Sequence, residues 1–136
     1  MDRLFEDVVV EGLRGHLARE GKWSRQPAWL HLDVEDRVPI RPDVVWYRAG
    51  RPPLVLDAKY KATTIAKNAD LYQMTAYCQA IGARRAVVIY ADVEPRVLRV
   101  RRDGPVIELL HLDLDGDLDS LRARLEDVAA RVRAEA

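Results

Sequence analysis

The chain has 136 residues, of which 49% are hydrophobic and 32% charged, which is the balance of a folded domain rather than a disordered segment. Its formal net charge is zero, and its single cysteine excludes an internal disulfide and any zinc site built from cysteines. No apolar run is long enough to span a membrane, and the N-terminus does not resemble a signal peptide. We therefore expect one cytoplasmic domain, residues 1–136, with no membrane partner.

The first part of the chain predicts a helix followed by strands. Apolar residues recur at helical spacing over residues 4–19, and Glu6 lies beside that apolar stripe, where it could reach water at the edge. Residues 21–27 read as a loop. Alternating or continuous apolar runs then predict three strands, over residues 28–35, 42–47 and 53–60.

The second part predicts a helix, more strands and a last helix. A polar loop at 61–67 leads to a helix that begins at Asn68 or Asp70 and ends at Ile81. Strands are expected over residues 86–90, 96–101 and 105–112. A final helix begins at Asp119 or Ser120, with an apolar stripe at Leu121, Leu125, Val128 and Val132. The order of elements is that of an α/β domain with a central mixed sheet flanked by helices.

The neutral total charge hides a basic middle. Residues 41–102 carry twelve Lys or Arg against five Asp or Glu, whereas the segments before and after them are acidic. Such asymmetry is typical of a surface that binds nucleic acid, although an unevenly charged solvated face would look the same.

The strongest chemical signal is Pro42-Asp43 followed, after thirteen intervening residues, by Asp57-Ala58-Lys59. If residues 42–60 form a hairpin centred on Gly50, Asp43 lies opposite Asp57, and directly opposed Cβ atoms are roughly 5 Å apart. Lys59 is two residues beyond Asp57 and therefore points to the same face of the strand. The sequence thus places two carboxylates and one ammonium group together.

Two neighbouring aspartates suit a divalent cation, because Mg²⁺ is usually held by one or two carboxylates together with water and substrate phosphate. The cation would neutralise the repulsion of the aspartates and lower the pKa of a bound water, and Lys59 could orient that water or stabilise phosphoryl charge. The pattern therefore predicts phosphodiester hydrolysis with Mg²⁺ or Mn²⁺. A structural ion pair between Lys59 and one of the aspartates is the alternative.

These residues resemble the signature of the PD-(D/E)XK nuclease superfamily, and the predicted order of elements is similar to that superfamily's restriction-endonuclease-like core. Residues 57–61 (DAKYK), 72–77 (YQMTAY) and 87–90 (VVIY) resemble the McrC family of nuclease subunits from 5-methylcytosine-specific McrBC restriction systems. Leu4-Phe5-Glu6 also resembles the start of that family's nuclease domain. The resemblance covers a core of about residues 4–91, with residues 92–136 as a C-terminal extension.

The resemblance implies metal-dependent cleavage of double-stranded DNA by a restriction system. Asp43, Asp57 and the backbone carbonyl of Ala58 would bind the metal, and Lys59 would be the catalytic lysine. Glu6 would be an accessory acid that could also bind metal, and Gln73 an auxiliary residue of the active site.

The residues themselves also single out Gln73. It shares a helix face with Ala69, Ala76, Tyr77 and Ala80, so it is expected to point inward, where its amide needs a partner such as Lys59, a DNA phosphate or a backbone group in the core. The basic middle of the chain should contact DNA phosphates near the site. The candidates for DNA contact are Arg48, Arg51, Lys61 and Lys67, with Tyr60 and Tyr77 flanking the strand that is cut, unless the two rings are simply packed.

The family's nuclease module follows an N-terminal region that docks onto a GTP-hydrolysing motor, here an McrB-like subunit. This chain begins almost at the nuclease core, so we expect either a fragment or a stand-alone relative. Gly15 to Lys22 does not have the spacing of a phosphate-binding loop, so no nucleotide should bind this chain. A homodimer, a nuclease acting on junctions, ends or RNA, and a non-cleaving nucleic-acid-binding or assembly module remain open.

Overall fold

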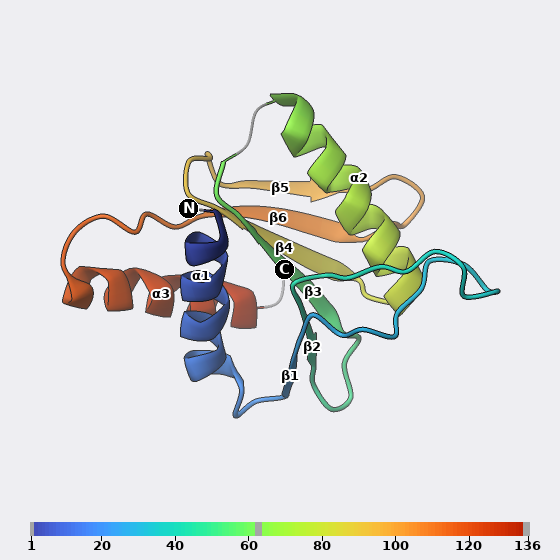
Figure 1. Cartoon of the computed structure of the whole chain (residues 1–136), viewed down its shortest axis with the longest axis horizontal. Helices are drawn as coiled ribbons and strands as arrows, with labels where there is room; N and C mark the ends of the chain where they lie inside the picture. Colours follow the sequence, from blue (N-terminus) through green and yellow to red (C-terminus); the bar gives the residue numbers. More distant parts are fainter. Residues whose placement is uncertain (1, 62–63, 135–136) are drawn as a thin grey trace.

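The computed structural model describes residues 2–61 and 64–134, which form three helices and a six-stranded sheet. The sheet order is β1-β2-β3-β4-β6-β5, and it is mixed: β3, β4 and β6 run parallel, whereas β1–β2, β2–β3 and β5–β6 are antiparallel pairs. The elements are α1 (Asp2–Leu17), β1 (Lys22–Arg25), β2 (Val44–Tyr47), β3 (Leu54–Lys59), α2 (Thr64–Ile81), β4 (Arg85–Tyr90), β5 (Arg96–Arg99), β6 (Val106–His111) and α3 (Leu118–Arg133) (Figure 1).

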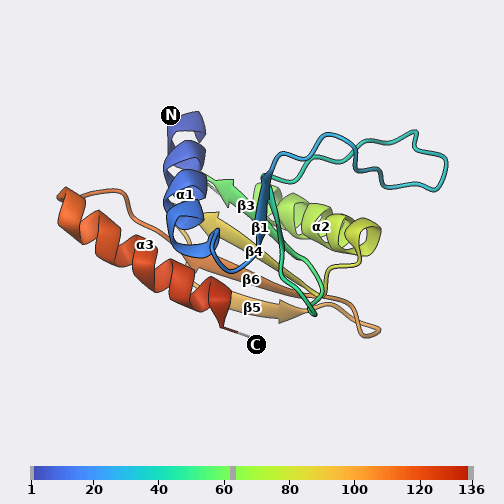
Figure 2. The ribbon, with the colours of Figure 1, turned by 90° about the horizontal axis from the view of Figure 1, so that it is seen from below.

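The sheet separates two helical layers. Helices α1 and α3 cover one face, and α2 covers the other (Figure 2). Each layer has its own buried cluster, because alternate residues of each strand point to opposite faces. Leu54 and Leu56 of β3 pack under α1 and α3, whereas Val55 packs under α2. The expected α/β class, with a mixed sheet flanked by helices, is confirmed.

The β2–β3 hairpin has the predicted register. Val44 pairs with Leu56 and Trp46 with Leu54, and the turn between the strands contains Gly50 at a φ of 74°, a conformation that favours glycine. Because β3 and β4 are buried on both faces, their sequences are continuous apolar runs rather than alternating patterns. The hairpin's open end therefore carries Asp43 and Asp57 next to each other.

The predicted strand over residues 28–35 is wrong, and the first strand is β1, inside the segment predicted as a loop. Trp23 of β1 pairs with Trp46, so β1 occupies the free edge of β2. The segment from residue 27 to 41 instead forms a loop that projects from the sheet (Figure 2). Its turn is closed by Asp33, whose carboxylate accepts hydrogen bonds from the backbone N–H groups of Arg37 and Val38. The alternating apolar residues belong to no strand of the sheet; instead the segment folds back on itself through an isolated antiparallel bridge between His31 and Pro39.

Two helix starts also differ from the prediction. Helix α2 begins at Thr64, so Lys67 and Asp70 are helical rather than in a loop or at a cap. Helix α3 begins at Leu118, and its cap is Asp117, whose carboxylate accepts a hydrogen bond from the Ser120 N–H at 2.8 Å. The apolar stripe of α3 is confirmed, with Leu125, Val128 and Val132 buried and Leu121 partly buried against the same cluster.

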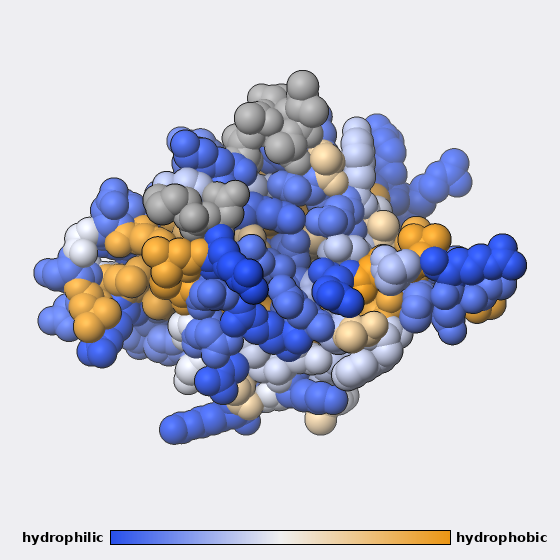
Figure 3. Space-filling model, in the orientation of Figure 1, coloured by the Kyte–Doolittle hydropathy of each residue, from blue (hydrophilic) through white to orange (hydrophobic). Residues whose placement is uncertain are grey.

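The surface in the view of Figure 1 is mostly hydrophilic, with an apolar area over α3 and the segment that leads to it (Figure 3). Leu118 at the start of α3 is 60% exposed. None of the described helices is both long and apolar enough to cross a bilayer.

Candidate active site

The two aspartates of the hairpin are joined through the backbone. The N–H of Asp43 donates to Oδ1 of Asp57 at 2.8 Å, and the N–H of Ala58 donates to Oδ2 of Asp43 at 2.9 Å. Each carboxylate thus uses one oxygen to bind the neighbouring strand's end. The exchange holds both side chains at the end of the sheet where β3 and α1 approach each other, as the hairpin register predicts.

Lys59 lies beside these carboxylates. Its Nζ atom is 3.2 Å from Oδ2 of Asp57 and 3.9 Å from Oδ1 of Asp70 on α2. The Lys59 side chain is 32% exposed, whereas that of Asp57 is 4% exposed, so the ammonium group lies between a buried carboxylate and solvent. Both interpretations of the sequence are thus realised in one geometry, because the candidate catalytic lysine is also an ion-pair partner of Asp57.

The electrostatics of the site favour a bound cation. Burial, reinforced by the charge of Asp43, raises the pKa of Asp57 to about 7, despite the opposing effect of Lys59. The pKa of Glu6 is also raised to about 7. Burial is the largest cause, and the charge of Asp43 and a hydrogen bond between the Glu6 and Asp43 side chains raise it further. Carboxylates that resist ionisation near neutral pH because they are buried, and because they lie next to one another, are stabilised when a cation neutralises them.

Glu6 joins the site from α1. It is half-buried and lines an open polar hollow together with Arg3, Asp7, Arg25 and Gln26. The guanidinium of Arg25 is held beside α1 by ion pairs with Asp7 and Glu11, which fixes it at the rim of this hollow. Glu6 was expected at the edge of the helix stripe, and the fold turns that edge towards Asp43.

The donor set fits a hard cation. No group of three or more His, Cys, Asp or Glu side chains arranged for metal binding occurs among residues 2–61 and 64–134. Asp43 and Asp57 nevertheless supply two adjacent carboxylates, and the remaining ligands of Mg²⁺ are commonly water and substrate phosphate. Asp43 and Asp57 are therefore the residues that could hold such a cation, and Glu6 lies close to Asp43.

Two residues of this network were not identified from the sequence. From the sequence, Asp70 is a candidate helix cap, and Tyr90 is the end of a strand within the VVIY segment that carries the family resemblance, with no role in the site. In the structure the Tyr90 hydroxyl donates to Oδ2 of Asp70 at 2.7 Å, and Tyr90 is paired with Lys59 across the β3–β4 ladder. The sequence signal for Tyr90 is its place at the end of the continuous apolar VVIY segment.

The prediction for Gln73 is partly corrected. The sheet-facing side of α2 is formed by Met74, Tyr77 and Cys78, whereas Ala69 is exposed. The predicted inward face was therefore rotated, because bulkier side chains rather than alanines fill the space above the sheet. Gln73 lies half-buried beside this face, one turn after Asp70.

The two candidate aromatic contacts are packed. Tyr77 is 8% exposed within the cluster beneath α2, and burial raises the pKa of its hydroxyl, which also contacts the backbone of Arg41. Tyr60 packs edge-on against Phe5 of α1, with ring centroids 5.8 Å apart. Both rings thus pack against other parts of the fold, although Tyr60 is only half-buried and also lies beside Lys61.

The candidate DNA-binding cations divide between the two ends of the sheet. Lys61 is exposed, directly follows the active-site strand, and its Nζ lies 5.7 Å from the Tyr60 ring centroid. Lys67 lies on α2, whose first turns approach the same end. Arg48 and Arg51 belong to the turn at the hairpin's other end, so the expectation that they lie near the site is wrong. The extended chain from Arg51 to Asp57 spans roughly 20 Å.

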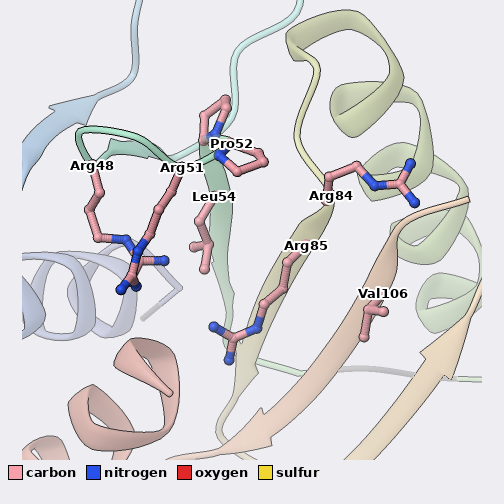
Figure 4. Close-up of a pocket in the computed structure, with 8 residues that line it drawn as sticks. Arg48, Arg51, Pro52, Leu54, Arg84, Arg85 and Val106 are labelled. Carbon is pink, nitrogen blue, oxygen red and sulfur yellow. The ribbon is translucent and has the colours of Figure 1, made fainter. Parts of the chain in front are cut away.

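Arg48 and Arg51 border a hollow of about 270 Å³ at that distant end, lined also by Arg84 and Arg85. In the view of Figure 4 the side chains of Arg48 and Arg51 extend in the same direction from the turn, while that of Arg84 points away from them. Arg85 is already bound: it donates to Glu108 and to backbone carbonyls at the end of α3. Arg48 stacks on Trp46, with its Cζ 4.2 Å from the ring centroid.

Comparisons with known proteins concern both the sequence and the fold. Residues 1–91 match the model of the family described as McrBC 5-methylcytosine restriction system component. A chain of the Thermococcus gammatolerans assembly described as a refined half-complex of McrB AAA+ hexamers with bound McrC has the same fold, at a TM-score of 0.73 and 17% identity. The match covers 97% of this chain and 33% of that one, so this chain spans about a third of its neighbour's length. Curated protein sequences give no match.

Proposed function

The chain belongs to the family of McrBC 5-methylcytosine restriction system components, and on that premise we propose that it is the nuclease domain of such a system, cutting DNA with the aid of Mg²⁺ or Mn²⁺. The observation that carries the proposal is the joining of Asp43 and Asp57 at one end of the sheet, with Lys59 3.2 Å from Asp57. We take residues 1–136 as one nuclease domain, with a core of about residues 4–91.

Asp43 and Asp57 would hold the cation, together with the backbone carbonyl of Ala58, and Glu6 would assist. When bound, Mg²⁺ would supply activation of the attacking water and neutralisation of the charge on the phosphate. Asp57 is pre-positioned for this role because its Oδ1 is engaged by the Asp43 backbone, which leaves Oδ2 facing Lys59.

Lys59 would contribute a positive charge beside the scissile phosphate. Burial alone would lower the pKa of its ammonium group, but Asp57 and Asp70 outweigh burial and raise it. Lys59 is therefore charged at neutral pH and suited to orient the attacking water by hydrogen bonding or to stabilise the charge that develops on phosphorus oxygens. Gln73, one turn along α2 from Asp70, is proposed as an auxiliary polar group for water or phosphate.

Double-stranded DNA is the proposed substrate. Lys61 and Lys67 would contact phosphates near the cut, and Arg48 and Arg51 phosphates roughly 20 Å away, a separation comparable to the width of a duplex. The proposed partner is a GTP-hydrolysing McrB-like subunit, because the structural neighbour comes from an assembly of McrB AAA+ hexamers with bound McrC. A cut through both strands would further call for two copies of the site, and so for a homodimer.

The direct test is cleavage of plasmid DNA. Wild-type protein and the Asp57→Asn variant are incubated with methylated or unmethylated plasmid, with Mg²⁺, Mn²⁺ or EDTA, and with or without an McrB-like motor and GTP. We expect nicked or linear product only with metal and wild-type protein, and more of it when the motor meets methylated DNA. Equal activity of Asp57→Asn, or activity in EDTA, would overturn the proposal.

A further inference from the structure

The network around Lys59 extends beyond the residues that would bind metal. Three elements meet there: Lys59 ends β3, Tyr90 ends β4, and Asp70 lies on α2 above both strands. Tyr90 is fully buried, and Asp70 is 16% exposed at its side chain. A buried hydroxyl and a mostly buried carboxylate need partners, and here they satisfy each other at 2.7 Å.

The geometry gives each oxygen of Asp70 a separate task. Oδ2 accepts the hydrogen bond of Tyr90, and Oδ1 lies 3.9 Å from Nζ of Lys59. Tyr90 thereby fixes the rotamer of Asp70, because a side chain bonded at one oxygen and rooted in a helix loses the freedom to turn away. Asp57 lies on β3, as Lys59 does, whereas Asp70 approaches Lys59 from α2. The ammonium group of Lys59 is therefore held between Asp57 and Asp70.

We propose that Asp70, oriented by Tyr90, is a positioning residue that sets where the ammonium group of Lys59 lies over the active site. This role rests on the proposed nuclease function, in which Lys59 contacts the attacking water or the phosphate. Lys59 already contacts Asp57 at 3.2 Å, so without Asp70 the carboxylate of Asp57 alone would set the position of the ammonium group. The pair Asp70–Tyr90 therefore supplies a second, fixed anion, which holds the ammonium group of Lys59 between two carboxylates.

An alternative purpose of the same hydrogen bond is to anchor α2 on the sheet. The variant Asp70→Asn separates the two roles. An asparagine oxygen still accepts the Tyr90 hydroxyl, so the helix stays anchored, but the negative charge that faces Lys59 is lost. The variant Tyr90→Phe does the reverse. It keeps the negative charge of Asp70 and the volume of the aromatic ring, but it removes the hydrogen bond that fixes the rotamer of Asp70. Asp127→Asn, an exposed change on α3, is the matched control.

The first readout does not depend on cleavage. The chain has four lysines, Lys22, Lys59, Lys61 and Lys67, so ¹⁵N labelling of lysine gives few ammonium signals, and Lys59→Arg assigns the one from Lys59. A held ammonium exchanges protons with water slowly and remains visible, whereas mobile surface groups exchange quickly. We expect the Lys59 signal in wild type and in Asp127→Asn, and its loss in Asp70→Asn and in Tyr90→Phe.

The second readout is single-turnover cleavage at saturating DNA. Asp70→Asn should lower the rate about 10- to 100-fold, as misplacement of a catalytic group by about 1 Å does, with DNA affinity unchanged. Tyr90→Phe should also lower the cleavage rate, with a smaller effect. If Asp70→Asn does not fold, Tyr90→Phe tests the positioning role in its place. Loss of melting temperature with an unchanged Lys59 signal and rate would overturn the proposal in favour of a helix anchor. If wild type does not cleave DNA, the proposed function fails, and the ammonium signal alone decides the positioning role.

Discussion

The backbone N–H of Asp43 donates to Oδ1 of Asp57 at 2.8 Å, and the next residue along β3, Ala58, returns a hydrogen bond to Asp43 at 2.9 Å. Two carboxylates that would repel each other are thus held together by neutral backbone donors. The arrangement leaves the second oxygen of each aspartate for other partners. It concentrates negative charge at one end of the sheet, where Lys59 is the only lysine paired with Asp57 in the described part of the chain.

Metal binding should depend on Asp57. Titration calorimetry with Mn²⁺ at pH 7.5 is expected to detect one site in wild type and none in Asp57→Asn, because the amide replaces a charged ligand by a neutral one. Asp127→Asn, which changes an exposed aspartate on α3, should bind Mn²⁺ like wild type. Equal binding by wild type and Asp57→Asn would rule out this position for the metal.

Replacement of Lys59 separates catalysis from packing. Lys59→Ala should lower the cleavage rate by about 10²–10³, the usual loss when one preorganised charge is removed, while DNA affinity changes little. The same change also leaves the buried carboxylate of Asp57 without its lysine, and a purely structural ion pair would make this cost about 3–5 kcal/mol of stability. Cleavage and thermal melting are measured on the same preparation. A large fall in melting temperature with normal activity in the folded fraction would identify Lys59 as structural.

The stability of the protein without metal should fall as pH rises from about 4 to about 7. Burial raises the pKa of Asp57 and of Glu6 to about 7, so the folded state retains protons that the unfolded chain has already lost. The stabilisation is complete below the ordinary carboxyl pKa and disappears as pH passes the folded value. Urea unfolding at pH 5 and pH 8 measures this difference, which Asp57→Asn should reduce.

Added Mg²⁺ should reverse that dependence. Because metal binds the ionised carboxylates of the folded state, millimolar Mg²⁺ is expected to raise the melting temperature more at pH 8 than at pH 5. Asp57→Asn provides the control, since it removes both the titrating group and the ligand. A Mg²⁺ effect of the same size at both pH values would contradict a site built from Asp43 and Asp57.

DNA affinity should depend on cations at both ends of the sheet. Binding of a short duplex is measured by anisotropy from 50 to 300 mM salt, with Ca²⁺ in place of Mg²⁺. Affinity should fall steeply with salt, and Lys61→Ala and Arg51→Ala should each reduce the slope by about one, because each removes one phosphate contact. Arg122→Ala, an exposed change on α3, is the control. An unchanged slope for Arg51→Ala would confine DNA to the active-site end.

A buried ion cluster should stabilise the fold without affecting the chemistry. Glu108 is fully buried; its Oε1 accepts from Arg85 Nε at 2.8 Å, and its Oε2 lies 2.9 Å from Arg131 Nε. Arg85 also binds the carbonyls of Arg131 and Val132, which attaches the end of α3 to the sheet. Glu108→Gln should therefore cost about 3 kcal/mol in urea unfolding. The exposed change Glu126→Gln should cost almost nothing, and neither variant should alter the cleavage rate of folded protein.

Much of the site follows from local rules. The hairpin register depends on where the turn falls and on which residues are apolar, and both are written in residues 42–60, so the sequence is enough to place Asp43 opposite Asp57. The same register puts Arg48 and Arg51 in the turn, which is the end of the hairpin far from Asp43 and Asp57. The helical stripe of α3 is equally readable, because its periodicity is local.

What the sequence did not determine are contacts between elements distant along the chain. Residues 28–35 have the alternation of a strand, but the edge of β2 is occupied by β1, and a strand forms only where another strand's hydrogen-bonding groups are available. The meeting of Asp70 with Lys59 and Tyr90 depends on how α2 crosses β3 and β4, which Met74, Tyr77 and Cys78 decide by packing on the sheet. The sequence by itself determined which residues could carry the chemistry, because hairpin register and residue type are local properties. Only the tertiary structure decided which charges surround Lys59, because packing between layers depends on the shapes of all the side chains that fill the space between them.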